Sequence, residues 1–369
     1  MNIVILGAGQ VGSELSQILA EEHDVTLIDI NEEKLQKISD HNDLRTICGN
    51  CCFPRTLESA DIASADLAVA MTQWDEVNMV ACQMIKHINK KTKTMARIRA
   101  TQYLAGKGRE IFEAGDYSID VIISPENLIT NYITKLIELP GAMQVLDFGN
   151  AMASMVQVKA TKGAPITGHK ISELKDHIPS ADTRVAAIYR NNELIIPTGD
   201  VFIVEKDEVF FITARSNLRK VMSEIREEDA RYKNIMIAGG GRIGRRIAKA
   251  LERNFRVKIV EADKERCVYL SEKLSNSLVL HGDTSDSELL DEEGIDQIDV
   301  FCAVTNNDEA NVMSSLLAKK QGAKNVLTLV NKKNYIELIK KQFYRSWAPK
   351  LIFSNEFFRK IPIIFDVEK

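Results

Sequence analysis

The chain has 369 residues, of which 45% are hydrophobic and 27% charged, and its formal net charge is −4. This composition is typical of a globular protein, and the length suffices for two or three domains. The acidic balance argues against a broad nucleic-acid-binding surface, and no apolar run reaches the roughly 18 residues that a membrane-spanning helix needs. A glycine turn interrupts the opening segment where a signal peptide would continue its apolar helix. We therefore expect an intracellular protein with reduced thiols.

The first segment of the chain predicts a strand, a tight turn, a helix and a second strand. Ile3–Leu6 form an apolar run that is typical of a strand buried in a parallel sheet. Gly7, Gly9 and Gly12 form a G-x-G-x-x-G turn before an amphipathic helix, and the second strand ends at Asp29. Such a turn lets the backbone approach a pyrophosphate, the helix N-terminus attracts anions, and the acid accepts hydrogen bonds from ribose hydroxyls. The arrangement predicts a nucleotide-binding site that disfavours a 2′-phosphate.

The same pattern recurs when the sequence is shifted by 232 residues. The segment "IMIAGGGRIG" (235–244) lies over "IVILGAGQVG" (3–12), and an acid again ends the second strand, at Glu261. After one inserted residue, "DVFCAVTNNDEAN" (299–311) lies over "DLAVAMTQWDEVN" (66–78). Six residues of this segment have identical partners in the second copy: Asp66, Ala70, Thr72, Asp75, Glu76 and Asn78. The fixed offset indicates an internal duplication, and therefore two units with the same fold.

Small polar residues follow the third and fourth predicted strands of each copy. Asn50 and Asp283 come after the third strand, and Thr72 and Thr305 end the fourth. Parallel sheets of this kind bind ligands at the carboxyl ends of their strands. We therefore expect these four side chains at the ligand-facing edge of the two sheets.

An acidic pair begins the helix after the fourth strand in both copies, Asp75 with Glu76 and Asp308 with Glu309. One interpretation is a carboxylate pair near a nucleotide or a bound cation. The other is that the acids complement the positive end of the helix dipole. The sequence leaves both interpretations open.

Half of the six cysteines lie in the segment "CGNCCFP" (48–54). The second copy has "HGDTS" (281–285) at this place, so it keeps the glycine and a small polar residue but none of the cysteines. A C-x-x-C zinc site normally has a second pair of ligands. We expect Cys48, Cys51 and Cys52 to be ordinary packing residues, with a redox or a metal-binding role as the alternatives.

The order of predicted elements defines an α/β fold with two Rossmann-like parallel-sheet domains separated by a small α+β domain. The first domain covers 1–125 and is followed by a crossover helix over 126–140. Short alternating strands without a glycine turn of their own predict the small domain over 141–225. The second Rossmann-like domain covers 230–345, and a divergent apolar tail covers 346–369.

The motifs of both halves, taken in order, resemble the TrkA family, the peripheral regulatory subunits of the Trk potassium uptake system. They include "GAGQVG", "AVAMTQWDEVNMVACQ" and "IDVIISPENLIT" in the first half and "IMIAGGGRIGRRIA", "LHGDTSD" and "CAVTNNDEANVMSSLLAKK" in the second. The resemblance covers the chain from its first residue to about 340 and implies RCK-type domains. It also implies a cytoplasmic ring of copies of this chain, peripheral on the inner face of the membrane, that gates a potassium-transporting membrane subunit of the Trk type. The implied ligand is NAD(H), with ATP or ADP as further candidates.

The resemblance also implies the residues of two ligand sites. The first site is lined by Gly7, Ala8, Gly9, Gln10, Val11, Gly12, Asp29, Asn50, Thr72, Gln73 and Arg97. The second site is lined by Gly239, Gly240, Gly241, Arg242, Ile243, Gly244, Glu261, Asp283 and Thr305. Arg97 has no basic counterpart in the second copy, so we expect the two sites to differ in affinity or in ligand.

The C-terminal segment departs from the family pattern in two respects. The pattern ends with a second small domain, which we expect to be absent here. Residues 340–369 also lack the "ID-x-x-x-SP" ending that the first copy shows at 119–125. We interpret this segment as an altered crossover or as a truncated or frame-shifted end.

Two other functions are alternatives to a regulatory subunit. A nicotinamide-dependent oxidoreductase needs an acid or base beside the nicotinamide, and no segment offers a His-Asp or Lys-Tyr pair for that role. We therefore expect no catalytic residues and no metal site. A nucleotide-sensing module for a transporter of another type remains the second alternative.

Overall fold

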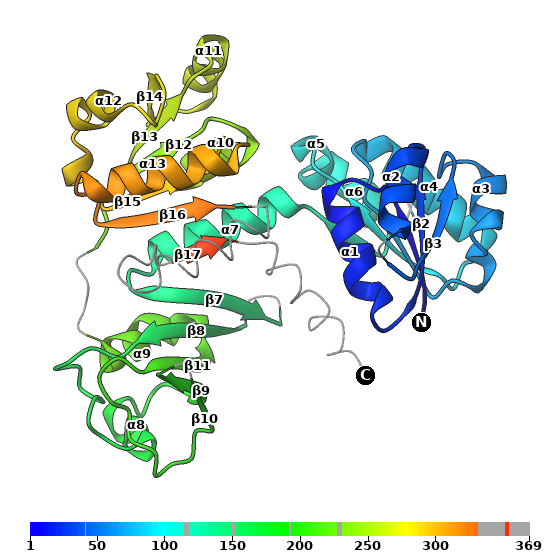
Figure 1. Ribbon diagram of the computed structural model, residues 1–369. Helices are drawn as coiled ribbons and strands as arrows, with labels where there is room; N and C mark the ends of the chain where they lie inside the picture. Colours follow the sequence, from blue (N-terminus) through cyan, green and yellow to red (C-terminus); the bar gives the residue numbers. More distant parts are fainter. Residues whose placement is uncertain are drawn as a thin grey trace. The chain divides into compact units, whose positions relative to one another are not determined.

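A six-stranded parallel sheet forms from the N-terminal third of the chain in the computed structural model (Figure 1). Its strand order is β3-β2-β1-β4-β5-β6. The strands are β1 (Asn2–Leu6), β2 (Asp24–Asp29), β3 (Arg45–Cys48), β4 (Leu67–Ala70), β5 (Lys93–Arg97) and β6 (Val121–Ile123). The structure describes residues 1–40, 42–113, 118–149, 152–191, 193–226, 231–330 and 351–353.

Helices cover both faces of this first sheet because its strands are apolar on both sides. Ile3 and Ile5 of β1 lie in one buried cluster with residues of α1 and α2, whereas Val4 and Leu6 lie in another with residues of α3 and α4. The helices are α1 (Gln10–Ala20), α2 (Glu32–Ser39), α3 (Pro54–Ser59), α4 (Asp75–Ile88), α5 (Thr101–Leu104) and α6 (Lys107–Glu113). These elements form one compact unit that ends at Glu126.

The second unit, Asn127–Lys369, takes in most of helix α7 (Pro125–Glu138), followed by a five-stranded antiparallel sheet. The sheet has the order β10-β9-β11-β8-β7. Its strands are β7 (Ala142–Phe148), β8 (Ala153–Lys159), β9 (Thr183–Arg190), β10 (Glu193–Ile195) and β11 (Glu208–Ala214), with helices α8 (Leu174–His177) and α9 (Leu218–Ile225). Residues of α9 alternate between buried and solvent-facing positions, as expected for an amphipathic helix on a sheet.

A second parallel sheet completes the second unit and has the same order as the first, β14-β13-β12-β15-β16-β17. The strands are β12 (Asn234–Ala238), β13 (Arg256–Glu261), β14 (Leu278–His281), β15 (Val300–Ala303), β16 (Asn325–Leu329) and β17 (Leu351–Phe353). The helices are α10 (Arg242–Leu251), α11 (Lys264–Lys273), α12 (Ser287–Glu292) and α13 (Asp308–Lys320). The predicted fold class, two parallel sheets separated by a small mixed domain, is therefore confirmed.

One continuous hydrophobic cluster runs through the second unit. It contains Ile133 and Ile137 of α7, Phe211 of the antiparallel sheet, and Ile235 and Ile247 of the second parallel sheet and its first helix. The small domain and the second Rossmann-like domain therefore share a core. Except for 351–353, the predicted divergent tail lies outside the described residues. No helix in the described ranges combines the length and the apolar character needed to cross a membrane.

Glu252, at the C-terminal end of α10, fixes the loop between α11 and β14 in the second parallel-sheet domain. Its side chain is buried, with the residue as a whole 5% exposed. It accepts hydrogen bonds from the backbone N–H groups of Ser275 and Asn276 and from the hydroxyl of Ser277, and it pairs with Lys249 at 2.8 Å. Burial alone would raise the pKa of this carboxyl, but the Lys249 ammonium and the three hydrogen bonds lower the pKa to about 2.

We expect Glu252→Gln to lower the free energy of unfolding of this domain by about 1–3 kcal/mol at neutral pH. Because the pKa is depressed in the folded state, the stabilisation is fully present above the ordinary value of 4.5 and is lost as the pH falls toward 2. Urea unfolding should show that the difference in the free energy of unfolding between wild type and variant becomes smaller as the pH falls over that range. Glu265→Gln, at an exposed position on α11, serves as the control, and a gap that stays constant with pH would contradict this account.

Candidate nucleotide-binding turns

Both glycine-rich turns begin with a residue in the left-handed region. Gly7 has φ +107° and Gly239 has φ +101°. Their N–H groups donate to the second strand of each sheet, Gly7 to the carbonyl of Ile28 at 2.7 Å and Gly239 to that of Val260 at 2.9 Å. Only glycine adopts this conformation without strain, so each turn is fixed directly to its sheet.

The third glycine of each turn permits close contact between strand and helix. A Cβ atom on Gly12 would lie 1.9 Å from the carbonyl oxygen of Gly7, and a Cβ atom on Gly244 would lie 1.9 Å from that of Gly239. The neighbouring atom is backbone in both cases and has no freedom to move away. These two positions therefore require glycine for the fold, independently of any ligand.

The middle glycine of each turn faces open space. A Cβ atom on Gly9 or on Gly241 would meet no other atom within 4 Å. Both residues are the N-caps of their helices, α1 and α10, and neither helix start is capped by a side chain. The first backbone N–H groups of these helices thus lie next to open space, where the helix dipole favours an anion. This combination fits a pyrophosphate group.

The other residues of the turns divide between core and surface. Ala8 is buried, and Val11 and Ile243 pack against hydrophobic clusters, so only their backbone groups are placed to meet a ligand. Gln10 and Arg242, the first residues of the two helices, are exposed. The second turn therefore presents a guanidinium where the first presents a neutral amide.

The acids at the ends of the second strands are bonded to the turns. Asp29 Oδ2 accepts from the backbone N–H of Ala8 at 2.6 Å, and Glu261 Oε2 accepts from that of Gly240 at 2.7 Å. The other oxygen of each acid accepts from a backbone N–H two residues further on, at Asn31 and Asp263. Each carboxylate thus holds its glycine turn in place from the carboxyl end of the second strand.

Asn50 and Asp283 shape the turns after the third strands. The side-chain oxygen of Asn50 accepts from the N–H of Cys52 at 2.9 Å, and that of Asp283 accepts from the N–H of Ser285 at 2.8 Å. The hydrogen bonds from the backbone and hydroxyl of Ser285 lower the pKa of Asp283. Both residues therefore belong to the strand-end edge, with one oxygen engaged in a local turn.

A buried asparagine organises the end of each fourth strand. Asn78 is completely buried, and its Oδ1 accepts from the backbone N–H of Thr72 at 2.9 Å and from the Thr72 hydroxyl at 2.7 Å. Its Nδ2 donates to the carbonyls of Thr72 and Arg97. In the second copy, Asn311 makes the same bonds to Thr305 and donates to the carbonyl of Leu329; the full set is Thr305 N–H at 2.8 Å, Thr305 hydroxyl at 2.7 Å, Thr305 carbonyl at 3.1 Å and Leu329 carbonyl at 2.9 Å.

The positioning role of this asparagine was missed by the sequence analysis. The available signal was the identity of Asn78 and Asn311 between the two copies. The hydroxyls of Thr72 and Thr305 donate to the side-chain oxygens of these asparagines, which holds the two threonines at the strand ends. The asparagine thus ties the fourth strand of each sheet to the end of the fifth.

Arg97 is the last residue of β5 and has no basic counterpart in the second copy. Its guanidinium lies 3.6 Å from Glu126, and its side chain is 18% exposed. Burial lowers the pKa of Arg97, with the Glu126 carboxylate acting in the opposite direction. The Nε atom is buried without a hydrogen-bond partner within the described ranges. Such an orphaned donor fits an anionic or polar ligand.

Gln73 and Asp75 fix the loops beside Arg97. The Gln73 carbonyl accepts a hydrogen bond from the guanidinium of Arg99. Asp75, in the first turn of α4, accepts from the backbone N–H groups of Arg99 and Ala100 at 2.9 and 2.7 Å. Asp75 therefore stabilises the loop after β5. The acidic pairs lie in the first turns of α4 and α13, where they are also placed to complement the helix dipole.

Cys51 and Cys52 pack around α3 and α4 as predicted, whereas Cys48, the last residue of β3, is exposed, so the prediction of a packing role was wrong for Cys48. Cys51 is buried, and burial followed by the neighbouring Cys52 raises the pKa of its thiol to about 12. Burial also raises the pKa of Cys52. In the parts of the chain that the structure describes, no three His, Cys, Asp or Glu side chains converge as metal ligands. A thiol that stays protonated is a poor nucleophile, so Cys51 acts as a core residue.

These features define a protein with two Rossmann-like domains whose strand ends carry matching, anion-compatible glycine turns. The TrkA-N domain family model matches residues 3–125 and 235–346, and the TrkA-C domain model matches residues 155–226. A Trk system potassium uptake protein TrkA of Halomonas elongata is 48% identical over 340 residues, which cover 92% of this chain and 74% of that protein. The chain belongs to the TrkA family, whose members are regulatory potassium uptake proteins rather than enzymes.

Two solved structures that share this fold have little sequence in common with the chain. The crystal structure of the GsuK RCK domain aligns with a TM-score of 0.72 at 15% identity, covering 99% of this chain and 77% of that one. The GsuK channel bound to NAD aligns with a TM-score of 0.72 at 16% identity, covering 99% and 64% of the two chains. At such identity the likeness establishes the RCK-type fold alone.

Proposed function

We propose that this chain is a regulatory subunit that binds NAD(H) at its two glycine turns, with ATP or ADP as competing ligands, and gates a potassium-transporting membrane subunit of the Trk type. The observation that carries the proposal is the duplicated turn: an open glycine at an uncapped helix start, beside a strand-end carboxylate. Membership of the TrkA family and the NAD-bound GsuK channel of the same fold support it.

In the first site, the start of α1 would bind the pyrophosphate, Asp29 the adenosine ribose, and Arg97 a further polar or anionic group. In the second site, the start of α10 and Arg242 would bind the phosphates, and Glu261 the ribose. NAD(H) would supply no chemistry here; its binding energy is used to favour one arrangement of the subunit over another. A ligand shifts such an equilibrium only by its difference in affinity for the two states.

The chain would work as a cytoplasmic ring of copies attached to the inner face of the membrane through its transporter partner. A shared hydrophobic core connects α7, the antiparallel sheet and the second parallel sheet in the second unit. Ligand-dependent movement within the ring would then be passed on to the partner. No nucleic acid partner is part of this proposal.

Gly9→Ala and Gly241→Ala test the two sites separately by calorimetric titration with NADH. The added methyl meets no protein atom but occupies the space where the pyrophosphate would approach. We expect the wild-type chain to bind two equivalents of NADH and each variant to bind one equivalent with the original affinity. At the altered site the affinity should fall at least tenfold, which corresponds to about 1.4 kcal/mol. NADPH should bind more weakly than NADH because Asp29 and Glu261 repel a 2′-phosphate.

Gly199→Ala is the matched control, because its Cβ would make only an ordinary contact with Ser172 in the small domain. The absence of saturable NADH binding at about 1 mM, roughly −4 kcal/mol, would refute the proposed ligand. The proposed control of potassium transport is tested in a separate experiment. Potassium uptake by cells with a Trk membrane subunit should depend on this chain, and the double variant Gly9→Ala/Gly241→Ala should lose the nucleotide response.

A further inference from the structure

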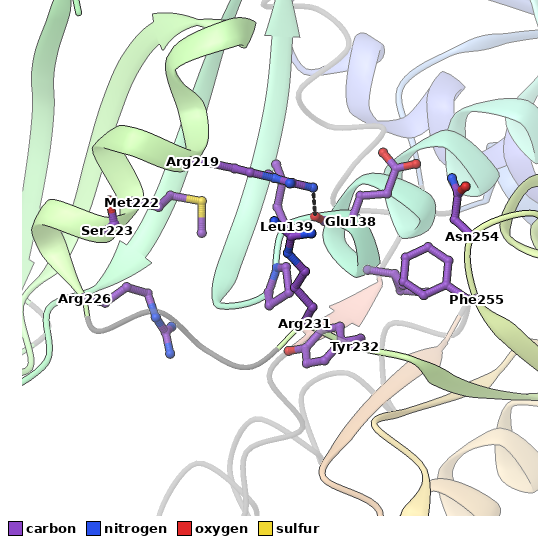
Figure 2. A pocket seen from close by; sticks show the side chains of 12 residues that line it. Glu138, Leu139, Arg219, Met222, Ser223, Arg226, Arg231, Tyr232, Asn254 and Phe255 are labelled. Carbon is purple, nitrogen blue, oxygen red and sulfur yellow. Dashed lines mark hydrogen bonds between the residues drawn. The ribbon is translucent and has the colours of Figure 1, made fainter.

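A cavity of about 300 Å³ lies in the second unit, and none of its lining residues belongs to the glycine turn of that unit. It is bounded by the end of helix α7, by helix α9 of the small domain, and by the start of the second parallel-sheet domain (Figure 2). A volume of this size is at the lower end of the range for small-molecule sites. Nothing in the proposed NAD(H) sites uses these residues.

Basic side chains predominate among the lining residues that the structure describes. Arg219, Arg226 and Arg231 line it, against a single carboxylate, that of Glu138. Arg219 lies in the first turn of α9, and Arg226 directly follows the last residue of that helix. Figure 2 shows Arg219, Met222 and Arg226 on one side of the space and Tyr232 and Phe255 on the other.

Arg219 reaches from α9 to the end of helix α7. Its guanidinium donates to the carbonyl of Glu138 at 3.5 Å, and no salt bridge to Arg219 or Arg231 occurs within the described ranges. Arg219 also lines a second cavity of about 270 Å³, where Asp147 is already paired with Lys135 and Glu138 is the other lining acid. Among the residues that the structure describes, no carboxylate is paired with Arg219.

The guanidinium of Arg226 packs closely against the backbone turn after α7. Its NH1 group donates to the carbonyl of Gly141 at 2.9 Å. A Cβ atom on Gly141 would lie 2.4 Å from that nitrogen, and Gly141 has φ +90°. The turn after α7 thus requires glycine both for its backbone conformation and for the approach of Arg226.

We propose that this cavity binds a small organic anion that carries a phosphate on a planar ring system. The guanidinium groups of Arg219 and Arg231 would bind the phosphate through charge-assisted hydrogen bonds. The rings of Tyr232 and Phe255, both half-buried, would contact the planar part. Because the cavity joins α7, α9 and the second parallel-sheet domain, the ligand fastens the small domain to that domain and acts as a regulator distinct from NAD(H).

The test uses the chain with both turns blocked, Gly9→Ala/Gly241→Ala, and AMP as the probe in calorimetric titration. We expect one saturable AMP site in this chain, weaker binding of ribose 5-phosphate, which lacks the base, and weaker binding still of inorganic phosphate. Arg219→Gln and Arg231→Gln should each weaken AMP binding about tenfold or more. Arg253→Gln, an exposed arginine next in sequence to the lining residue Asn254 that does not itself line the cavity, should leave AMP binding unchanged.

No saturable AMP binding to the blocked chain would overturn the proposal, as would an equal loss with Arg253→Gln. Equal affinities for AMP and ribose 5-phosphate would overturn the planar-ring part of it. These results would leave the NADH titration of the wild-type chain unaffected, so the two proposals fail independently. Thermal unfolding of each arginine variant confirms that the loss of binding is not a loss of fold.

Discussion

Gly12→Ala is expected to abolish folding of the first parallel-sheet domain or to destabilise it by about 3 kcal/mol or more. A methyl group at this position would lie 1.9 Å from the carbonyl oxygen of Gly7. That carbonyl belongs to a turn whose N–H is bonded to Ile28 and whose next residue is bonded to Asp29. The turn cannot move without breaking these bonds, so helix α1 must separate from the sheet instead.

Gly9→Ala is the matched control in the same turn, because its methyl group faces open space. We expect its unfolding temperature to stay within a few degrees of wild type while its NADH affinity falls. Circular dichroism gives the unfolding temperatures, and hydrogen–deuterium exchange over β1 and α1 locates the loss in Gly12→Ala. Equal destabilisation by the two substitutions would show that close packing is not what requires Gly12. Gly244→Ala and Gly241→Ala repeat the comparison in the second copy.

The glycine turns were predictable from the sequence because their requirements are local. An apolar run of four residues, three spaced glycines and a helical apolar face lie within some twenty consecutive residues. The duplication then aligned the other strand ends, so that the repeat alone paired Asp29 with Glu261 and Asn50 with Asp283. The same alignment indicated that the glycine and the small polar residue after the third strand are required by the fold, whereas the three cysteines are not.

Contacts between distant segments could not be predicted in this way. The sequence suggested that Asp29 reads a ribose, but not that the same carboxylate holds the N–H of Ala8. It separated the small domain from the second Rossmann-like domain, whereas the two share one hydrophobic cluster. The cavity around Arg219 depends on this shared core, and no periodicity in the sequence encodes it. Each of these features arises from burial that only the assembled fold defines.

Asn78→Ala should lower the free energy of unfolding of the first domain by about 2–5 kcal/mol. The substitution removes four hydrogen bonds and leaves the backbone N–H of Thr72 and the carbonyl of Arg97 without their partner. Each buried backbone group that loses its partner costs about 1–3 kcal/mol. Urea unfolding monitored by circular dichroism measures the change. Asn131→Ala, an exposed asparagine on α7, is the control and should change the free energy of unfolding by about 0.5 kcal/mol at most.

The same substitution should also weaken NADH binding at the first site, although Asn78 is completely buried and would not touch the ligand. Asn78 sets the position of the β4 end relative to the β5 end, and through it the backbone of Thr72 and of Arg97. Binding at the second site should be unchanged by Asn78→Ala and weakened by Asn311→Ala, because each asparagine acts only within its own sheet. If either variant loses stability while keeping full affinity at its own site, the asparagine is structural alone. A loss at both sites from one substitution would instead mean that the two turns are coupled through the assembled protein.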